Sequence, residues 1–253
     1  MMINLVNYTT KLGQQYTLFR FATNAMESFK SSPPSFREFL QKEKERLSHA
    51  TQSREEFKNG GPDTADMLQS LCTFLEDKLD FDSEKQLDTL LLRLRQQSVI
   101  HFHAAFEALL RDILRELLYK HQENLKADRD IKLGKLISTP KESIIREEIE
   151  RQIALFDRWS VEDKAKYFQD KFGISWSTYW THAFKSLNQF RQEILHDDID
   201  RVVIDDDVEL ALEVTSILGW GICMQGWLLD PELFYVGQVD KRRIEEDCKL
   251  FRK

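Results

Sequence analysis

Apolar residues recur with the period of an α-helix in the middle of the chain. Phe102, Phe106, Leu109, Ile113 and Leu117 are spaced by four, three, four and four residues. This spacing places the five side chains on one face and predicts a long helix over roughly residues 85–122.

Two further helices follow from the pattern. Phe184, Leu187, Phe190 and Ile194 recur three or four residues apart, which predicts a second amphipathic helix. Residues 208–229 are apolar nearly all round, which is typical of the most buried helix of a domain.

Glycines 219, 221 and 226 interrupt this apolar segment. Glycine weakens a helix interior by about 1 kcal/mol, so we expect close packing there against a neighbouring backbone. The uncharged run from 214 to 229 is short for a bilayer span, so no membrane association is expected.

Capping residues divide the rest of the chain. Helix-start signals occur at Ser35–Glu38, Ser83–Gln86, Thr139-Pro140 and Ser160–Asp163. Further helices are predicted over 16–29, 36–47 and 67–79, with a break at Asn59-Gly60-Gly61-Pro62, and only 201–204 resembles a strand. The predicted fold is all-α, with an N-terminal helical region (1–84), a helical domain (85–235) and a charged C-terminal tail (236–253), itself helical or frayed from residue 241.

Composition narrows the class of protein. The 253 residues contain 36 Lys and Arg against 43 Asp and Glu, a net charge of −7, with only 9 Gly and 5 Pro. These values exclude collagen-like and low-complexity chains. The acidic balance argues against coating nucleic acid through bulk charge, although it leaves room for a local basic cleft. Three distant cysteines and the lack of a secretory signal lead us to expect a cytoplasmic protein.

The first candidate for chemistry is an Arg191–His196 pair at the end of the second helix. The two residues are about 7.5 Å apart along an ideal helix and roughly 140° apart around it. They converge only if the helix ends or distorts, or if a partner chain supplies a second pair. Arginine suits a phosphate, and histidine exchanges protons near neutral pH. Together they could cleave RNA without a metal.

The sequence offers few alternatives to the Arg191–His196 pair as a catalytic site. Walker, Gly-x-Gly-x-x-Gly, Gly-x-Ser-x-Gly and His-Glu-x-x-His motifs are absent from the sequence. A divalent-cation site at His196, Asp197 and Asp198 is a weaker alternative. The acids at 205–207 are interpreted as complementing the dipole of the buried helix.

A second polar cluster lies on the long helix, comprising His101, His103, Arg93, Arg95, Arg111 and Arg115. It is interpreted first as a solvated face paired with Asp112 and Glu116, and alternatively as the basic wall of a substrate groove. The aromatic residues Trp176, Tyr179 and Trp180 are expected in the core or an interface rather than stacked on bases.

The order of these elements resembles the HEPN domain family (higher eukaryotes and prokaryotes nucleotide-binding), most closely its RiboL-PSP-HEPN or MAE-type branch. The residues that carry the resemblance are the His101–Leu114 segment, Lys164–Trp176, Leu187–His196 and the apolar helix that follows, roughly residues 90–230. The family motif is an arginine followed by four to six residues and a histidine near a helix end.

The resemblance implies a homodimer with two Arg-His pairs facing across a cleft. It implies a metal-independent endoribonuclease without a cofactor, acting as a toxin or antiphage effector, with an antitoxin or defence-system protein as a possible partner. Arg191 and His196 match the catalytic positions, with Gln192 beside the arginine and Glu107 able to orient it.

The acidic surroundings of the motif argue against nuclease activity. From 191 to 209 the sequence holds two basic and eight acidic residues, which would repel RNA unless the acids point away from the cleft. The alternative is a non-catalytic HEPN-like module that binds a protein, a nucleotide or nucleic acid.

Overall fold

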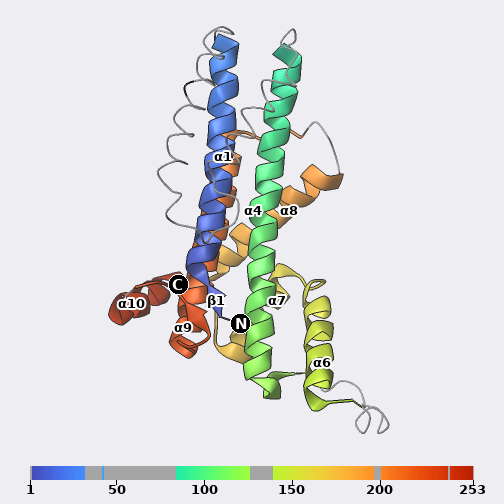
Figure 1. The fold of residues 1–253 in the computed structure, drawn as a ribbon, viewed down its shortest axis with the longest axis vertical. Helices are drawn as coiled ribbons and strands as arrows, with labels where there is room; N and C mark the ends of the chain where they lie inside the picture. The colour runs from blue at the N-terminus through green and yellow to red at the C-terminus, as the bar shows by residue number, and fades with distance from the viewer. Residues whose placement is uncertain are drawn as a thin grey trace. The chain divides into compact units, whose positions relative to one another are not determined.

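The computed structural model describes residues 2–31, 42, 84–125, 139–196, 201–238 and 240–252. Its elements are β1 (Ile3–Asn4), α1 (Leu5–Ser31), α4 (Glu84–Lys120), the short 3₁₀ helix η1 (Gln122–Asn124), α6 (Lys141–Phe156), α7 (Val161–Phe172), α8 (Thr178–His196), α9 (Asp205–Leu229), β2 (Phe234–Tyr235) and α10 (Lys241–Arg252). The all-α class is confirmed for these residues (Figure 1).

The chain divides into two compact units. The first contains residues 1–10, 101–199 and 210–253, and the second contains 11–100 and 200–209. Helices α1, α4 and α9 each contribute residues to both units. The division therefore runs through these helices.

The core of the first unit is built on the predicted apolar face of α4. Phe102, Phe106, Ile113 and Leu117 are fully buried, and Leu109 is nearly so. Helix α6 lies beside the C-terminal part of α4 (Figure 1), where Arg115 pairs with Glu150 at 2.8 Å and with Asp112 at 2.8 Å. The spacing in the sequence thus gave both the helix and its buried side.

Helix α7 has clear start and stop signals. The Ser160 side chain accepts a hydrogen bond from the Asp163 backbone N–H at 3.1 Å, as the sequence predicts. Gly173 ends the helix with a φ of 67°, a left-handed conformation that favours glycine. The helix-start signal at Thr139-Pro140 is followed by α6, with Pro140 at the N-cap position just before Lys141.

The segment between α7 and α8 is fixed by a buried amide. The Gln225 side chain accepts a hydrogen bond from the Ser175 N–H at 3.0 Å and donates one to the Ser175 carbonyl at 2.6 Å. Arg252 of α10 donates to the same amide at 2.8 Å. Trp176 is buried, as predicted, whereas Tyr179 is 70% exposed. These contacts set the start of α8, the helix that carries the predicted site.

Two very short strands join distant parts of the sequence. Ile3 pairs with Phe234 and Asn4 with Tyr235 in a parallel arrangement. The Tyr8 hydroxyl donates to the Thr215 carbonyl at 3.0 Å, and burial is the main cause that raises the pKa of this phenol. Residues 201–204, the segment whose sequence resembles a strand, are in neither a strand nor a helix.

Helix α9 confirms the prediction of a buried apolar helix, but its glycines face rings rather than backbone. A Cβ at Gly219 would meet Tyr8, one at Gly221 would meet Phe251, and one at Gly226 would meet Phe234. Gly221 thus makes room for α10, the helical form of the predicted C-terminal tail. The buried side of α10 comprises Ile244, Cys248 and Phe251.

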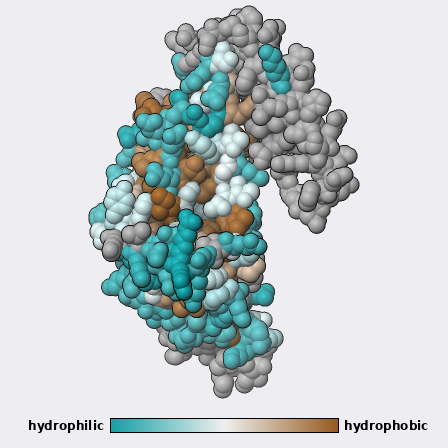
Figure 2. Space-filling model, turned by 90° about the vertical axis from the view of Figure 1, so that its left-hand side faces the viewer, coloured by the Kyte–Doolittle hydropathy of each residue, from teal (hydrophilic) through white to brown (hydrophobic). Residues whose placement is uncertain are grey.

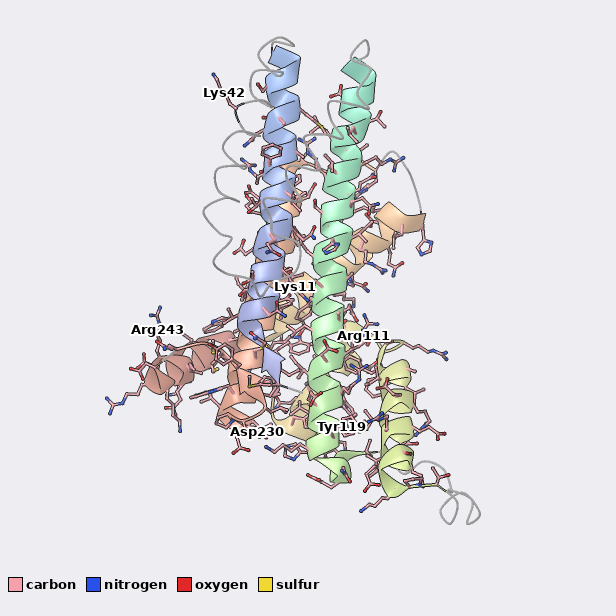
Figure 3. The ribbon with its side chains drawn as sticks, in the orientation of Figure 1. Lys11, Lys42, Arg111, Tyr119, Asp230 and Arg243 are labelled. Atoms are coloured by element: carbon pink, nitrogen blue, oxygen red, sulfur yellow. The ribbon has the colours of Figure 1, made fainter. Side chains whose placement is uncertain are left out.

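Polar contacts occupy the ends of the helices. Lys120, the last residue of α4, pairs with Asp230 after α9, and Arg146 of α6 donates to the hydroxyl of Tyr119 at 3.2 Å. Figure 3 labels Tyr119 and Asp230, the partners in these two contacts. In the second unit, Arg95 pairs with Asp205 at 2.6 Å. The first-turn acids of α9 lie where the dipole argument predicts, and Asp205 has this guanidinium partner as well.

No helix among the described residues is long and apolar enough to cross a membrane. On the face drawn in Figure 2, hydrophilic residues cover most of the coloured surface and apolar residues form patches between them. Several predictions fall outside the described residues: the helix 36–47 apart from residue 42, the helix 67–79, the break at 59–62, the starts at Ser35 and Ser83, and the carboxylates Asp197 and Asp198.

Candidate functional site

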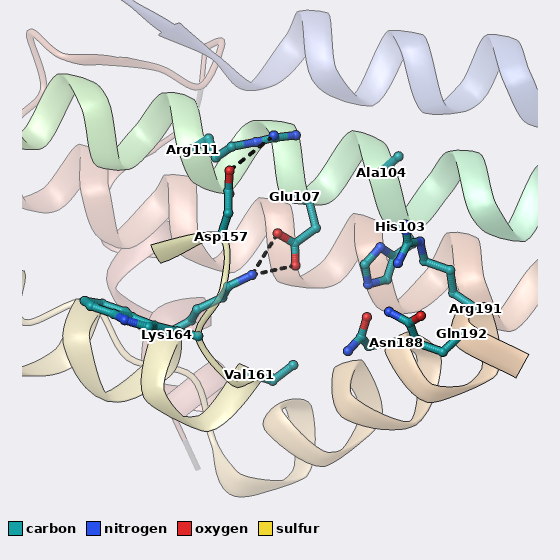
Figure 4. A pocket seen from close by; sticks show the side chains of 11 residues that line it. His103, Ala104, Glu107, Arg111, Asp157, Val161, Lys164, Asn188, Arg191 and Gln192 are labelled. Carbon is teal, nitrogen blue, oxygen red and sulfur yellow. Dashed lines mark hydrogen bonds and ion pairs between the residues drawn. The ribbon is translucent and has the colours of Figure 1, made fainter. Parts of the chain in front are cut away.

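A polar pocket lies in the first unit, between the C-terminal half of α4, the start of α7 and the end of α8. Its volume is about 470 Å³. The lining comprises His103, Ala104, Glu107, Arg111, Asp157, Trp159, Val161, Lys164, Asn188, Arg191 and Gln192 (Figure 4). Three of the four predicted site residues, Arg191, Gln192 and Glu107, therefore lie around one cavity.

Helical spacing explains how the walls are built. His103, Glu107 and Arg111 are four residues apart and form a polar stripe along α4, beside the apolar face. Asn188 and Arg191 are three residues apart on α8, so they project from one side of that helix. The pocket is the space between these two polar stripes.

Two ion pairs occupy one part of the pocket. The Lys164 ammonium lies 2.9 and 3.0 Å from the two carboxylate oxygens of Glu107, and 5.2 Å from the centre of the Phe156 ring. Arg111 lies 3.6 Å from Asp157. Figure 4 shows both pairs on the side away from Arg191. Glu107 is therefore engaged by Lys164 and does not orient Arg191 as the resemblance implied.

His103, Asn188, Arg191 and Gln192 gather at the other end (Figure 4). The His103 ring is 3% exposed and stacks on Phe184, with ring centres 5.0 Å apart and planes 10° apart. His103 was expected on a solvated face, and its burial corrects that interpretation, whereas His101 is exposed.

The environment of His103 favours its neutral form. Burial lowers the pKa of this imidazole from 6.5 to about 4, helped by the nearby cations Arg191 and Lys164, while a hydrogen bond with Asn188 acts in the opposite direction. The Nε2 atom of His103 and the Nε atom of Arg191 are buried and have no hydrogen-bond partner among the described residues.

The charge of the pocket is unbalanced at the Arg191 end. Three cations, Arg111, Lys164 and Arg191, face the carboxylates of Glu107 and Asp157, and each carboxylate already has a partner. Within the described part of the chain, Arg191 has no carboxylate in salt-bridge range. The pocket is thus suited to an anion, because an arginine can offer two parallel N–H groups to phosphate oxygens.

His196 does not join this cluster within the protomer. It is the last residue of α8, is exposed, and lies outside the pocket lining. Helix α8 runs without interruption to this residue, so the angular separation from Arg191 expected of a regular helix applies. Convergence of the predicted pair would require a second chain.

The described residues contain no group of three or more His, Cys, Asp or Glu side chains placed to hold a metal ion. The alternative cation site at His196, Asp197 and Asp198 falls largely outside these residues.

Comparisons of this chain with protein-family models, with curated proteins and with solved structures find no match. The family resemblance therefore depends on the motif and the order of elements alone.

Proposed function

We propose that the protein is a metal-independent endoribonuclease of HEPN type, with Arg191 stabilising the charged phosphorane during RNA cleavage. The observation that carries the proposal is the position of Arg191, whose guanidinium faces a polar pocket without an anionic partner among the described residues. A scissile phosphate supplies the missing negative charge, and that charge increases in the transition state.

In this proposal His196 acts as the proton-transfer group from a homodimer cleft. Its exposure at the end of α8 leaves it accessible to a second chain and to RNA. Gln192 lines the same cavity and is exposed, so it can donate a hydrogen bond to the RNA backbone. Glu107 supports the site indirectly by holding Lys164. A cytoplasmic toxin or antiphage role belongs to the proposal through the resemblance.

Cleavage of a fluorescent single-stranded RNA by the full chain, with EDTA present, tests the proposal. Arg191→Ala and His196→Ala are each expected to lower the rate by about 100-fold or more. Arg146→Ala and His101→Ala are matched controls, because both residues are exposed and lie outside the pocket. Cleavage that survives in the Arg191→Ala variant contradicts the assignment. Cleavage that occurs without EDTA but stops when EDTA is added favours the alternative metal site at His196.

A second function is a non-catalytic module that binds an anionic partner. The observation in its favour is the separation of His196 from the pocket, which leaves Arg191 able to bind a phosphate without a proton-transfer group beside it. This function predicts RNA or nucleotide binding that depends on Arg191, with no cleavage and no effect of His196→Ala.

A further inference from the structure

Two buried nitrogen atoms lie at the same end of the pocket and lack partners. They are Nε2 of His103 and Nε of Arg191, each without a hydrogen bond to the described residues. An unpaired buried polar atom is unfavourable. A ligand that accepts hydrogen bonds from both groups would relieve this cost, and Figure 4 shows the two side chains next to each other.

The charges facing His103 come from every element around the pocket. Helix α4 contributes Glu107 and Arg111, the turn before α7 contributes Asp157, α7 contributes Lys164, and α8 contributes Arg191. Both carboxylates are held in ion pairs. The remaining positive charge lies with Arg191, directly beside the imidazole.

We propose that His103 and Arg191 bind a phosphate monoester dianion within a single protomer, and that His103 takes up a proton as the anion binds. The inference rests on the anion-binding role proposed for Arg191, but it requires neither a dimer nor cleavage. It assigns a role to a histidine outside the Arg-His motif.

The ligand class follows from charge and size. A dianion gains more than a diester monoanion from a site that offers a guanidinium and an imidazolium together. The pocket volume of about 470 Å³ exceeds that of a bare phosphate and lies within the range of small-molecule sites. Ala104, Trp159 and Val161 supply an apolar part of the lining that suits an attached nucleoside. The dianion that binds here is therefore either the phosphate group of a mononucleotide or free phosphate.

The proton uptake has a defined direction. In the free protein the His103 pKa is about 4, because burial and the cations Arg191 and Lys164 disfavour the imidazolium. A bound anion opposes those cations and raises the pKa. Anion affinity then falls by about tenfold per pH unit as the pH rises from about 4 to the raised His103 pKa of the complex. Above that pKa the affinity is constant.

Sulfate is a suitable first probe, since it stays a dianion over the whole range. Calorimetric titration of the full chain between pH 4 and 8 should give the pH dependence described above. NMR of the His103 ring should show a pKa at least one unit higher with saturating sulfate. Arg191→Gln should weaken binding about tenfold or more. His103→Gln should remove the pH dependence, whereas His101→Gln, an exposed site on the same helix, should retain it.

The two possible ligands, a mononucleotide and free phosphate, are distinguished by comparing the binding of adenosine monophosphate, inorganic phosphate and adenosine. Tighter binding of the nucleotide than of phosphate identifies a nucleotide site, and equal binding of the two identifies a phosphate site. The proposal is overturned if sulfate, inorganic phosphate and adenosine monophosphate all fail to bind, if adenosine binds as well as its monophosphate, or if His103→Gln keeps the wild-type pH dependence. Sulfate binding without RNA cleavage would support this inference and contradict the nuclease proposal. Cleavage without sulfate binding would support the nuclease proposal and contradict this inference.

Discussion

Two ionisable residues in the pocket wall, His103 and Lys164, are almost completely removed from water, with 3% and 4% of each residue exposed. Burial has opposite consequences for them. Lys164 has a carboxylate in contact and is held as an ion pair. His103 has two cations nearby, so the same burial favours its neutral form.

The depressed pKa of His103 predicts loss of stability in acid. The unfolded imidazole titrates near 6.5 and the folded one near 4, so the unfolded chain binds the extra proton first as the pH falls. Stability that is complete above pH 6.5 is lost towards pH 4, by about 3 kcal/mol at 1.36 kcal/mol per pKa unit.

Urea unfolding of wild type and His103→Gln at several pH values measures this contribution. The difference in pH dependence between the two proteins isolates the imidazole from the carboxylates that titrate in the same range. His101→Gln serves as the control, because an exposed imidazole should leave the pH profile unchanged. Parallel profiles for wild type and His103→Gln would contradict the assignment.

The Lys164–Glu107 pair predicts a large effect of removing one partner. Lys164→Met leaves the Glu107 carboxylate, 19% exposed, without its ammonium, and should lower the free energy of unfolding by about 3 kcal/mol. The double variant Lys164→Met/Glu107→Leu should recover much of this loss, because no isolated charge remains. Lys185→Met breaks an exposed pair with Glu162 and should change stability little. Equal effects at both lysines would show that burial is not the cause.

At the scale of helices, the apolar pattern predicted α4, α8 and α9. Helices α4 and α8 each bury one face that the spacing records, whereas α9 is apolar nearly all round. The capping signal at Ser160 is also confirmed, because its side chain accepts a hydrogen bond from the Asp163 N–H. The apolar pattern did not give the pairing of Ile3 with Phe234, since two-residue strands have no periodicity and their register depends on residues distant in sequence.

The sequence predicted the α8 wall of the pocket but, of the α4 wall that faces it, only Glu107 as a site residue. The motif indicated Arg191, and the polar stripe of His103, Glu107 and Arg111 at four-residue spacing was available as a signal for the facing wall. The sequence analysis interpreted the cluster that contains His103 and Arg111 first as a solvated face, and only alternatively as the wall of a substrate groove. Which stripe faces which is decided by how the helices pack, and that is not encoded in the spacing along either helix.

The glycines of α9 give an element-scale prediction. Gly226→Ala would place a Cβ into the ring of Phe234, which is 1% exposed and paired in β2. Overpacking of this kind typically costs about 1–3 kcal/mol and should exceed the gain of about 1 kcal/mol from helix propensity.

Gly13→Ala is the matched control. Gly13 lies in α1, and a Cβ there meets nothing within 4 Å. The same substitution should therefore stabilise the protein by about 0.5–1 kcal/mol. Urea unfolding of both variants checks the opposite signs. Stabilisation by Gly226→Ala would mean that the ring moves aside easily and that the contact does not position β2.

At the scale of the whole molecule, the two proposals for the pocket differ in whether one chain or two complete it. The His103–Arg191 site is contained in one protomer, whereas the Arg191–His196 site requires a second chain. In a symmetric dimer, each composite site takes its arginine from one protomer and its histidine from the partner.

Heterodimers of two inactive variants separate these cases. Arg191→Ala and His196→Ala chains carrying different tags can be co-expressed and isolated by two affinity steps. Such a dimer keeps one intact composite site, so we expect about half of the wild-type cleavage activity per dimer. A heterodimer of Arg191→Ala with His103→Gln lacks an intact intraprotomer pocket on either side, so its sulfate binding should lack the wild-type pH dependence. The composite site is contradicted if no dimer is recovered, or if the heterodimer does not regain cleavage. Wild-type monomers should still bind sulfate in that case, because the His103–Arg191 site needs only α4, α7 and α8 of a single chain.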